Sequence, residues 1–178
     1  EDNDLKKSVI LLIFLIFFVT LSLGLFIDTK DVNSPLVGKQ MPSFNLEELK
    51  TGNLVNSQYL PKNAFLINVW ASWCLECTRE HMLLKDIQKQ GIDIIGINYK
   101  DNRSDALGWL AIYGNPYLFN IHDINGELGL EMGVYGVPET FIIDKKGIII
   151  DKFIGAIDEK IFKNNILPKI QKANQNKF

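Results

Sequence analysis

Cysteine and histidine are scarce in this chain of 178 residues, which has two of each. Two cysteines cannot make the disulfide framework of a small secreted scaffold, and two histidines are few for a multi-ligand metal site. No charge of one sign is in excess either, since the formal net charge is −2. A nearly neutral chain offers no electrostatic surface for nucleic acid, so we expect no nucleic-acid partner.

Internal repeats, low-complexity tracts and a dinucleotide-binding G-x-G-x-x-G fingerprint are also absent from the sequence. Without that fingerprint, the protein is not expected to draw electrons from NADPH or a flavin, and we expect no cofactor. At about 150 residues per domain, the length leaves no room for a second full-size domain.

The sequence does contain one long apolar run, residues 8–27, in which 16 of 20 residues are apolar and none is charged. A helix of this length spans about 30 Å, the thickness of the hydrocarbon core of a membrane. The run is longer than the apolar stretch of a cleavable signal peptide, and no small-x-small site follows it. We therefore expect an uncleaved transmembrane anchor; a signal peptide and a buried core helix are the alternatives.

The charges that flank this run predict its orientation. Lys6 and Lys7 precede it, whereas residues 28–31 after it carry mixed charge. By the positive-inside rule, the C-terminal part then lies outside the cytoplasm. The expected organisation is a cytoplasmic N-terminus (1–7), the anchor (8–27), a tether (28–40), a globular domain (41–173) and a C-terminal tail (174–178).

The globular part begins with a predicted strand–helix–strand unit. The continuous apolar runs Ala64–Trp70 and Ile92–Tyr99 each predict a strand buried on both faces of a sheet. Between them, residues 74–90 have apolar side chains at helical spacing and end at Gly91. Such a unit implies two parallel strands joined by a right-handed crossover.

Further elements are expected along the rest of the chain. They are a helix over Ser104–Tyr113 capped by Ser104, a strand over Tyr117–His122, a short helix over Gly126–Met132, two strands (Thr140–Asp144 and Ile148–Ile154) joined by a hairpin turn at Lys145-Lys146-Gly147, and a last helix that follows Asp158 and is kinked at Pro168.

Cys74 and Cys77 form a C-x-x-C motif where the first buried strand ends and the helix begins. This position favours redox chemistry, because the unpaired N–H groups of a helix N-terminus stabilise a thiolate at Cys74. A thiolate attacks a disulfide to form a mixed disulfide. Cys77, one turn further on and more buried, can then resolve it.

Other uses of the two cysteines fit the sequence less well. A structural disulfide would close too short a loop to contribute much stability. A metal site would have three donors, with His81 as the third, unless His122 joined them, so we expect no metal. Haem attachment needs His directly after the second cysteine, where this chain has Thr78. Both histidines are expected to be surface or helix-face residues.

A second motif, GVYGVPET, runs from Gly133 to Thr140, just before an expected strand. A cis bond between Val137 and Pro138 would bend the chain tightly and leave the backbone of Val137 free to take the extended chain of a substrate. A trans proline in a loop before an edge strand would explain these residues equally well.

The segment NVWASWCLEC from Asn68, with GVPETF about 60 residues later, resembles thioredoxin-fold proteins. It is more closely similar to the membrane-anchored, periplasmic thiol:disulfide interchange proteins of the DsbE (CcmG) type, which serve cytochrome c maturation. The resemblance extends from about Gly38 to Lys172 and includes the more specific segments GINYKD from Gly96 and GVYGVPETF from Gly133. It implies a thioredoxin-like α/β fold ordered βαβ, an insertion over about residues 100–135, then ββα, preceded by the transmembrane helix.

The resemblance also implies roles for the residues of the site. Cys74 and Cys77 would form a redox-active disulfide in which Cys74 attacks and Cys77 resolves. Trp73 and a cis Pro138 would flank them. Residues Val137 and Glu139 would contact the substrate.

One position departs from thioredoxins, which have a buried Asp where this chain has Asn68. Since Asn68 cannot titrate, the closest acidic candidate to accept the proton of the inner thiol is Glu80. Glu76 lies between the cysteines, and we expect Glu80 and Glu139 nearby. Negative charge around the site disfavours the thiolate, so it should favour the disulfide and make the protein a reductant.

The resemblance finally implies partners and a location. The electron donor would be a transmembrane thiol reductase of the DsbD type. The acceptor would be the C-x-x-C-H disulfide of apocytochrome c, or a cytochrome c maturation component that holds it, and the chain would lie in the cell inner membrane with its C-terminal domain in the periplasm. The alternatives are a general periplasmic thioredoxin-like reductase and a membrane-anchored copper chaperone; such chaperones usually have C-x-x-x-C and a distant His.

Overall fold

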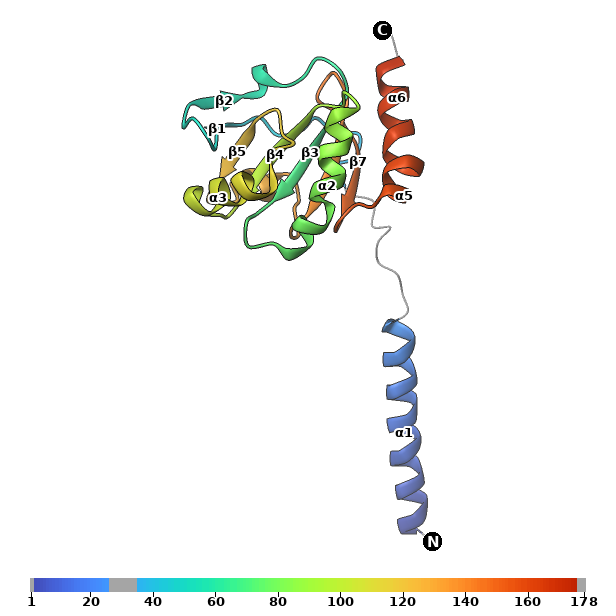
Figure 1. Ribbon diagram of the computed structural model, residues 1–178. Helices are drawn as coiled ribbons and strands as arrows, with labels where there is room; N and C mark the ends of the chain where they lie inside the picture. Colours follow the sequence, from blue (N-terminus) through green and yellow to red (C-terminus); the bar gives the residue numbers. More distant parts are fainter. Residues whose placement is uncertain (1, 26–34, 176–178) are drawn as a thin grey trace. The chain divides into compact units, whose positions relative to one another are not determined.

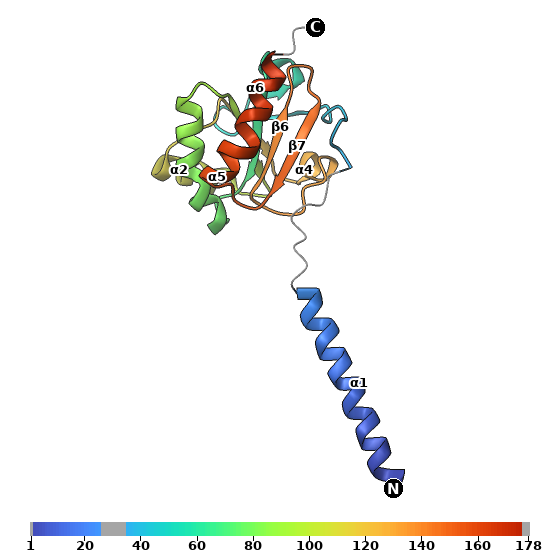
Figure 2. The ribbon, with the colours of Figure 1, turned by 90° about the vertical axis from the view of Figure 1, so that its right-hand side faces the viewer.

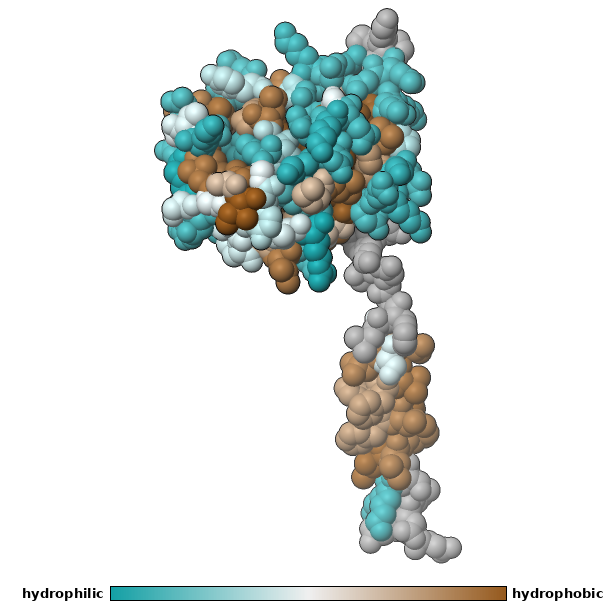
Figure 3. Space-filling view, viewed as in Figure 1, coloured by the Kyte–Doolittle hydropathy of each residue, from teal (hydrophilic) through white to brown (hydrophobic). Residues whose placement is uncertain are grey.

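Residues 8–25 of the apolar run near the N-terminus lie in helix α1 (Asp2–Leu25). The computed structural model describes residues 2–25 and 35–175. The large apolar side chains between Val9 and Leu23 are exposed along this helix, and they form the brown surface of α1 in Figure 3. Among the described residues, no helix meets both the length and the apolarity required to cross a membrane.

The chain divides into two units, Glu1–Val32 and Asn33–Phe178. The end of the expected anchor at residues 26–27, most of the expected tether (28–34) and the last part of the expected tail (176–178) lie outside the described residues.

A five-stranded sheet in the order β5-β4-β3-β6-β7 forms the centre of the second unit (Figure 1). Its strands are β3 (Phe65–Trp70), β4 (Ile94–Tyr99), β5 (Asn120–Asp123), β6 (Glu139–Ile143) and β7 (Ile149–Ile154). β3 runs parallel to β4 and antiparallel to β6, and β6 pairs antiparallel with β7. The expected βαβ unit and the expected hairpin are therefore both confirmed, and the fold is a thioredoxin-like α/β fold.

The helices cover the two faces of this sheet (Figures 1 and 2). They are α2 (Leu75–Lys89), α3 (Arg103–Tyr113), α4 (Glu127–Glu131), α5 (Glu159–Ile161), a π-helical turn (Phe162–Ile166) and α6 (Leu167–Gln175). Successive residues of β3 belong to different cores: Leu66 packs with residues of α2, α3 and α6, and Ile67 packs with residues of α4. The continuous apolar run of β3 thus reflects burial on both faces.

Several local expectations differ from the structure. α3 begins at Arg103 with Asn102 as its N-cap, so the expected cap at Ser104 is wrong. The helix begins at this point because the Asn102 carbonyl already accepts the Ala106 N–H at 2.9 Å. The expected kink at Pro168 is a π-helical turn just before it, in which the Leu167 N–H donates to the Phe162 carbonyl.

A hairpin made of β1 (Asn45–Glu47) and β2 (Leu54–Asn56) was not predicted from the sequence. A strand of three residues is too short to show a period of two. The hairpin continues the sheet edge, since Glu48 bridges to Ile121 of β5.

Gly96 in β4 shows how tightly the edge strand β5 is joined to the centre. A Cβ at this position would lie 2.0 Å from Asn120 Oδ1 and 2.8 Å from Trp70 Nε1. These two atoms form a hydrogen bond of 3.0 Å across the face of Gly96. Only glycine leaves room for that bond, which explains the first residue of the GINYKD segment.

Candidate active site

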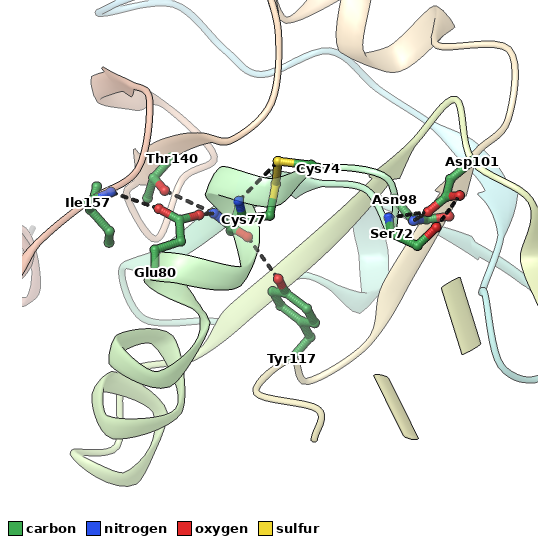
Figure 4. The surroundings of a disulfide bond; sticks show 10 residues. Ser72, Cys74, Cys77, Glu80, Asn98, Asp101, Tyr117, Thr140 and Ile157 are labelled. Carbon is green, nitrogen blue, oxygen red and sulfur yellow. Dashed lines mark hydrogen bonds between the residues drawn. A yellow bond between two sulfur atoms is a disulfide. The ribbon is translucent and has the colours of Figure 1, made fainter. Parts of the chain in front are cut away.

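Cys74 and Cys77 form a disulfide at the N-terminus of α2 (Figure 4). Cys74 is the N-cap residue, with extended backbone angles, and its Sγ accepts the Cys77 N–H at 3.0 Å. A helix begins here because the residues after Cys74 have apolar side chains on one face only, and Cys77, Leu84 and Ile87 are buried. The first-turn N–H groups and the positive end of the helix dipole therefore point at the attacking sulfur.

Both cysteine side chains lie just beneath the surface, with 5% of Cys74 and 2% of Cys77 exposed. Around them, Trp73 and Leu75 are exposed. The Trp73 indole N–H donates to the Lys100 carbonyl at 3.1 Å, which fixes this ring beside the disulfide.

The Val137–Pro138 peptide bond is cis, as the resemblance implies. Val137 is half-buried and packs against the cluster of side chains that contains both cysteines. Among the described residues, its backbone N–H and carbonyl have no backbone partner. The geometry agrees with the prediction that Val137 can pair with an extended substrate chain.

Glu139 is buried next to this loop and does not face solvent. Its carboxylate accepts the N–H groups of Tyr135 (2.9 Å) and Gly136 (3.3 Å) and forms an ion pair with Lys152 (2.9 Å). Lys152 also donates to the Gly133 carbonyl at 2.6 Å. Glu139 thus holds the loop in place. Its cationic partner on β7 could not be predicted from the local sequence pattern.

Glu80 lies one turn after Cys77 on α2 and is 2% exposed. Its carboxylate accepts the Asn68 side-chain N–H at 2.7 Å and the Ile157 N–H at 2.8 Å. Asn68 in turn accepts the Tyr117 hydroxyl at 2.8 Å and donates to Thr140 Oγ1 at 3.1 Å. Figure 4 shows this chain of bonds beside the disulfide.

Burial raises the pKa of Glu80 to about 7, although its bonds to Ile157 and Asn68 lower it. Desolvation prevails because both donors are neutral. A carboxyl group with this pKa can both accept and release a proton near neutral pH, as a general acid or base must. Burial, with the Glu80 charge as a smaller cause, raises the pKa of Tyr117 well above its ordinary value, so its hydroxyl stays protonated and donates.

The acidic surround expected from the sequence is largely compensated by cations. Glu76 pairs with Arg79 at 2.6 Å on the exposed side of α2. Glu139 pairs with Lys152. Of the three carboxylates named from the sequence, Glu80 is the one with neutral partners.

Both histidines were expected to be surface or helix-face residues. Both are buried, so the surface position is wrong, whereas His81 does lie on a face of helix α2. His81 packs edge-on against Trp109, with ring centroids 4.5 Å apart, and its Nε2 contacts the Gly114 carbonyl at 2.9 Å. His122 contacts the Asp101 carbonyl at 3.0 Å. Among the described residues, no cluster of three or more His, Cys, Asp or Glu side chains could hold a metal ion.

Two functional contacts, those of Asp101 and Tyr117, were missed at the sequence level. Both lie in the segment 100–135 and reach back to β3 or to the loop before Cys74. The GINYKD segment ends at Asp101, so its resemblance to the DsbE type could have drawn attention to the contacts of that residue. Tyr117, expected at the start of a strand, is buried, and nothing in the sequence indicated its bond to Asn68.

The chain is similar to a known protein family and to several curated proteins. Residues 36–167 match the family model described as Redoxin. The chain is 44% identical over 161 residues to the thiol:disulfide interchange protein DsbE of Pseudomonas fluorescens biotype C, with 90% of each chain covered. It is 39% identical over 180 residues to the protein of the same name from Escherichia coli (strain K12), covering 95% of this chain and 97% of that one.

Solved structures agree with these relatives. A crystal structure of a thiol:disulfide interchange protein DsbE from Chlorobium tepidum, described there as putative, has a TM-score of 0.67 and 25% identity, covering 77% of this chain and 96% of that one. A secreted thiol-disulfide isomerase from Corynebacterium glutamicum has a TM-score of 0.65 at 23% identity, covering 74% and 86%, and supports the fold.

Proposed function

Because the chain belongs to the redoxin family, and within it to the DsbE-type thiol:disulfide interchange proteins, we propose that it is a membrane-anchored periplasmic reductase of cytochrome c maturation. Thiol–disulfide oxidoreductase activity at Cys74 and Cys77 is the part that the family and the disulfide establish. The proposed substrate is the disulfide of apocytochrome c or of a maturation component that holds it.

One observation carries this proposal: both segments that resemble the DsbE type border the disulfide. The GINYKD segment ends in Lys100 and Asp101, which bind the loop before Cys74. The GVYGVPETF segment contains the cis Pro138 and Val137, which packs with the cysteines. The two segments that resemble the DsbE type therefore lie next to the attacking sulfur. Contacts at this place discriminate between substrates, so their DsbE-like sequence supports a defined substrate.

In the proposed reaction, the Cys74 thiolate of the reduced protein attacks one sulfur of the substrate disulfide. A mixed disulfide forms and one substrate thiolate leaves. The Cys77 thiol then loses its proton to Glu80, and its thiolate attacks Cys74. The second substrate thiolate leaves, so the substrate gains two electrons and the Cys74–Cys77 disulfide forms. The released thiolates take up two protons, one that Glu80 gives up and one from solvent that balances the proton lost when the Cys74 thiolate formed.

The direction of electron flow is proposed to be toward the substrate. Negative charge on Glu80 opposes a second anion at Cys77 and so favours the disulfide over the reduced pair. We expect a reduction potential nearer to that of thioredoxin, about −270 mV, than to that of DsbA, about −120 mV. Titration against glutathione would contradict this if it gave a potential above about −150 mV.

The anchor and the electron donor are part of the same proposal. The apolar run of residues 8–27, preceded by Lys6 and Lys7, supports a single span with the C-terminal domain in the periplasm. The periplasm is kept oxidising, so a reductase there needs electrons from across the membrane. A transmembrane dithiol reductase of the DsbD type is the proposed donor.

A trapping experiment tests the substrate. Replacement of Cys77 (Cys77→Ala) in the full chain removes the resolving thiol, so mixed disulfides with Cys74 accumulate. Apocytochrome c or a maturation component among the trapped proteins is the expected result, and Cys74→Ala is the control that traps nothing. Many unrelated envelope proteins without these components would instead identify a general reductase.

A further inference from the structure

The carboxylate of Asp101 is buried on the opposite side of the disulfide from Glu80 (Figure 4). Its Oδ2 accepts the Ser72 N–H at 2.6 Å and the Asn98 side-chain N–H at 2.8 Å. Its Oδ1 accepts the Ser72 hydroxyl at 2.8 Å and the Asn102 N–H at 2.9 Å. Four donors therefore meet one carboxylate, and two of them belong to the residue two positions before Cys74.

All four donors are neutral. None of the ion pairs within residues 2–25 and 35–175 includes Asp101. A buried carboxylate without a cation is costly unless hydrogen bonds satisfy its oxygens, and here each oxygen accepts two. An amide could not replace it, since the N–H₂ group would face donors from Ser72, Asn98 or Asn102.

A second contact joins the same two loops. The indole N–H of Trp73 donates to the carbonyl of Lys100, the residue before Asp101. Lys100 has φ of +48°, a left-handed conformation that residues with a Cβ rarely adopt. The loop after β4 is thus held in an unfavourable shape in which it binds both residues that precede Cys74.

We propose that Asp101 is a positioning residue for the attacking sulfur: by holding Ser72, it keeps Cys74 at the N-cap of α2. The position of Cys74 then depends on contacts outside its own helix. At the N-cap, the Cys77 N–H points at Cys74 Sγ and can stabilise a thiolate there. If residues 72–73 moved, the thiolate would lose this donor and the helix dipole.

The proposal makes a prediction opposite in sign to a purely electrostatic one. Asp101→Asn removes a negative charge near Cys74, and by charge alone this would stabilise the thiolate and lower the Cys74 pKa. If Asp101 acts by position, the same variant raises the Cys74 pKa, because the loop loosens. The inference depends on thiol–disulfide exchange at Cys74 and not on the identity of the substrate.

The test is the rate of alkylation of Cys74 by iodoacetamide against pH, in the full chain with Cys77→Ala as background. We expect Asp101→Asn to raise the pH midpoint of alkylation by about one unit. At pH values below the midpoint, the fraction of Cys74 present as thiolate would then fall about tenfold. Asp105→Asn is the matched control: it removes an exposed carboxylate that contacts Asn102 but not Ser72, and it should leave the midpoint unchanged.

Ser72→Ala makes the test independent of whether Asp101→Asn folds, because it removes one bond and leaves the buried charge in place. We expect a smaller shift in the same direction. A midpoint that falls or stays unchanged in the folded variants overturns the proposal, even if their melting temperatures fall. If the shift is seen but the trapping experiment yields no maturation component, the substrate assignment fails and the positioning role stands.

Discussion

Two buried glutamates border the active site, and their partners differ. Glu139, fully buried, pairs with Lys152 and accepts two backbone N–H groups of the cis-proline loop. Glu80, equally inaccessible, has neutral donors alone and a pKa raised to about 7. Glu139 is tied to a cation and to the backbone of the loop as part of the structure, whereas Glu80, which has neutral partners, can exchange a proton near neutral pH. Equal burial therefore does not mean an equal role.

The largest expected effect comes from breaking the Glu139–Lys152 pair. Lys152→Met leaves a buried carboxylate without its cation and should lower the free energy of unfolding by about 3–5 kcal/mol. Denaturant unfolding of the full chain, followed by tryptophan fluorescence, measures this. Lys163→Met removes one partner of the exposed pair with Glu159 and should change stability by less than about 1 kcal/mol. Similar losses in the two variants would contradict the structural role of Lys152.

The second prediction concerns pH and stability. The pKa of Glu80 rises from 4.5 to about 7 on folding, so the folded state binds more protons between these values. Stability from this group is complete below about pH 4.5 and is lost as the pH rises to about 7, by roughly 3 kcal/mol. Glu80→Gln should remove this decline from the pH profile of unfolding. An unchanged slope in the variant would show that Glu80 titrates normally.

A third, smaller effect should appear in the chemistry. If Glu80 accepts the proton of Cys77, Glu80→Gln slows resolution of the mixed disulfide by about tenfold or more at pH 7. Stopped-flow measurement of the mixed-disulfide lifetime with a small model disulfide gives this rate. The first attack by Cys74 should keep its rate, which separates a proton role from general damage. Equal slowing of both steps would contradict the assignment.

The smallest expected effect is that of Tyr117→Phe. This variant removes the hydroxyl that Asn68 accepts, so it should cost about 1 kcal/mol of stability. Asn68 then holds Glu80 less firmly, and the Glu80 pKa should rise slightly. The pH profile of unfolding measures both changes. A lower Glu80 pKa in the variant would mean that the hydroxyl does not support Asn68.

The sequence predicted the framework of the sheet because β3, β4 and α2 have patterns set by burial. It placed Cys74 at the start of α2, where the structure has it. Glu80 was named as the nearest acid from its spacing alone, and the structure adds the burial that raises its pKa.

Contacts between segments far apart in the chain could not be predicted in this way. The bonds Lys152–Glu139, Tyr117–Asn68 and Asp101–Ser72 depend on how strands align, which local patterns do not specify. The same holds for His81, whose burial depends on the rings that pack over it from α3. The strands β1 and β2 were not predicted because three residues are too few to show the alternation of buried and exposed side chains.

The segment 100–135 has a consequence for protein engineering. Asp101, Tyr117 and Asn120 reach from it to Ser72, Asn68 and Trp70, all within six residues of Cys74. A chimera in which this segment is shortened to the length found in a smaller thioredoxin-like chain would therefore lose these three hydrogen bonds beside the active site. Transfer of the segment into another thioredoxin-like protein would require Ser72, Asn68 and Trp70 to be transferred with it, since the same hydrogen bonds depend on them.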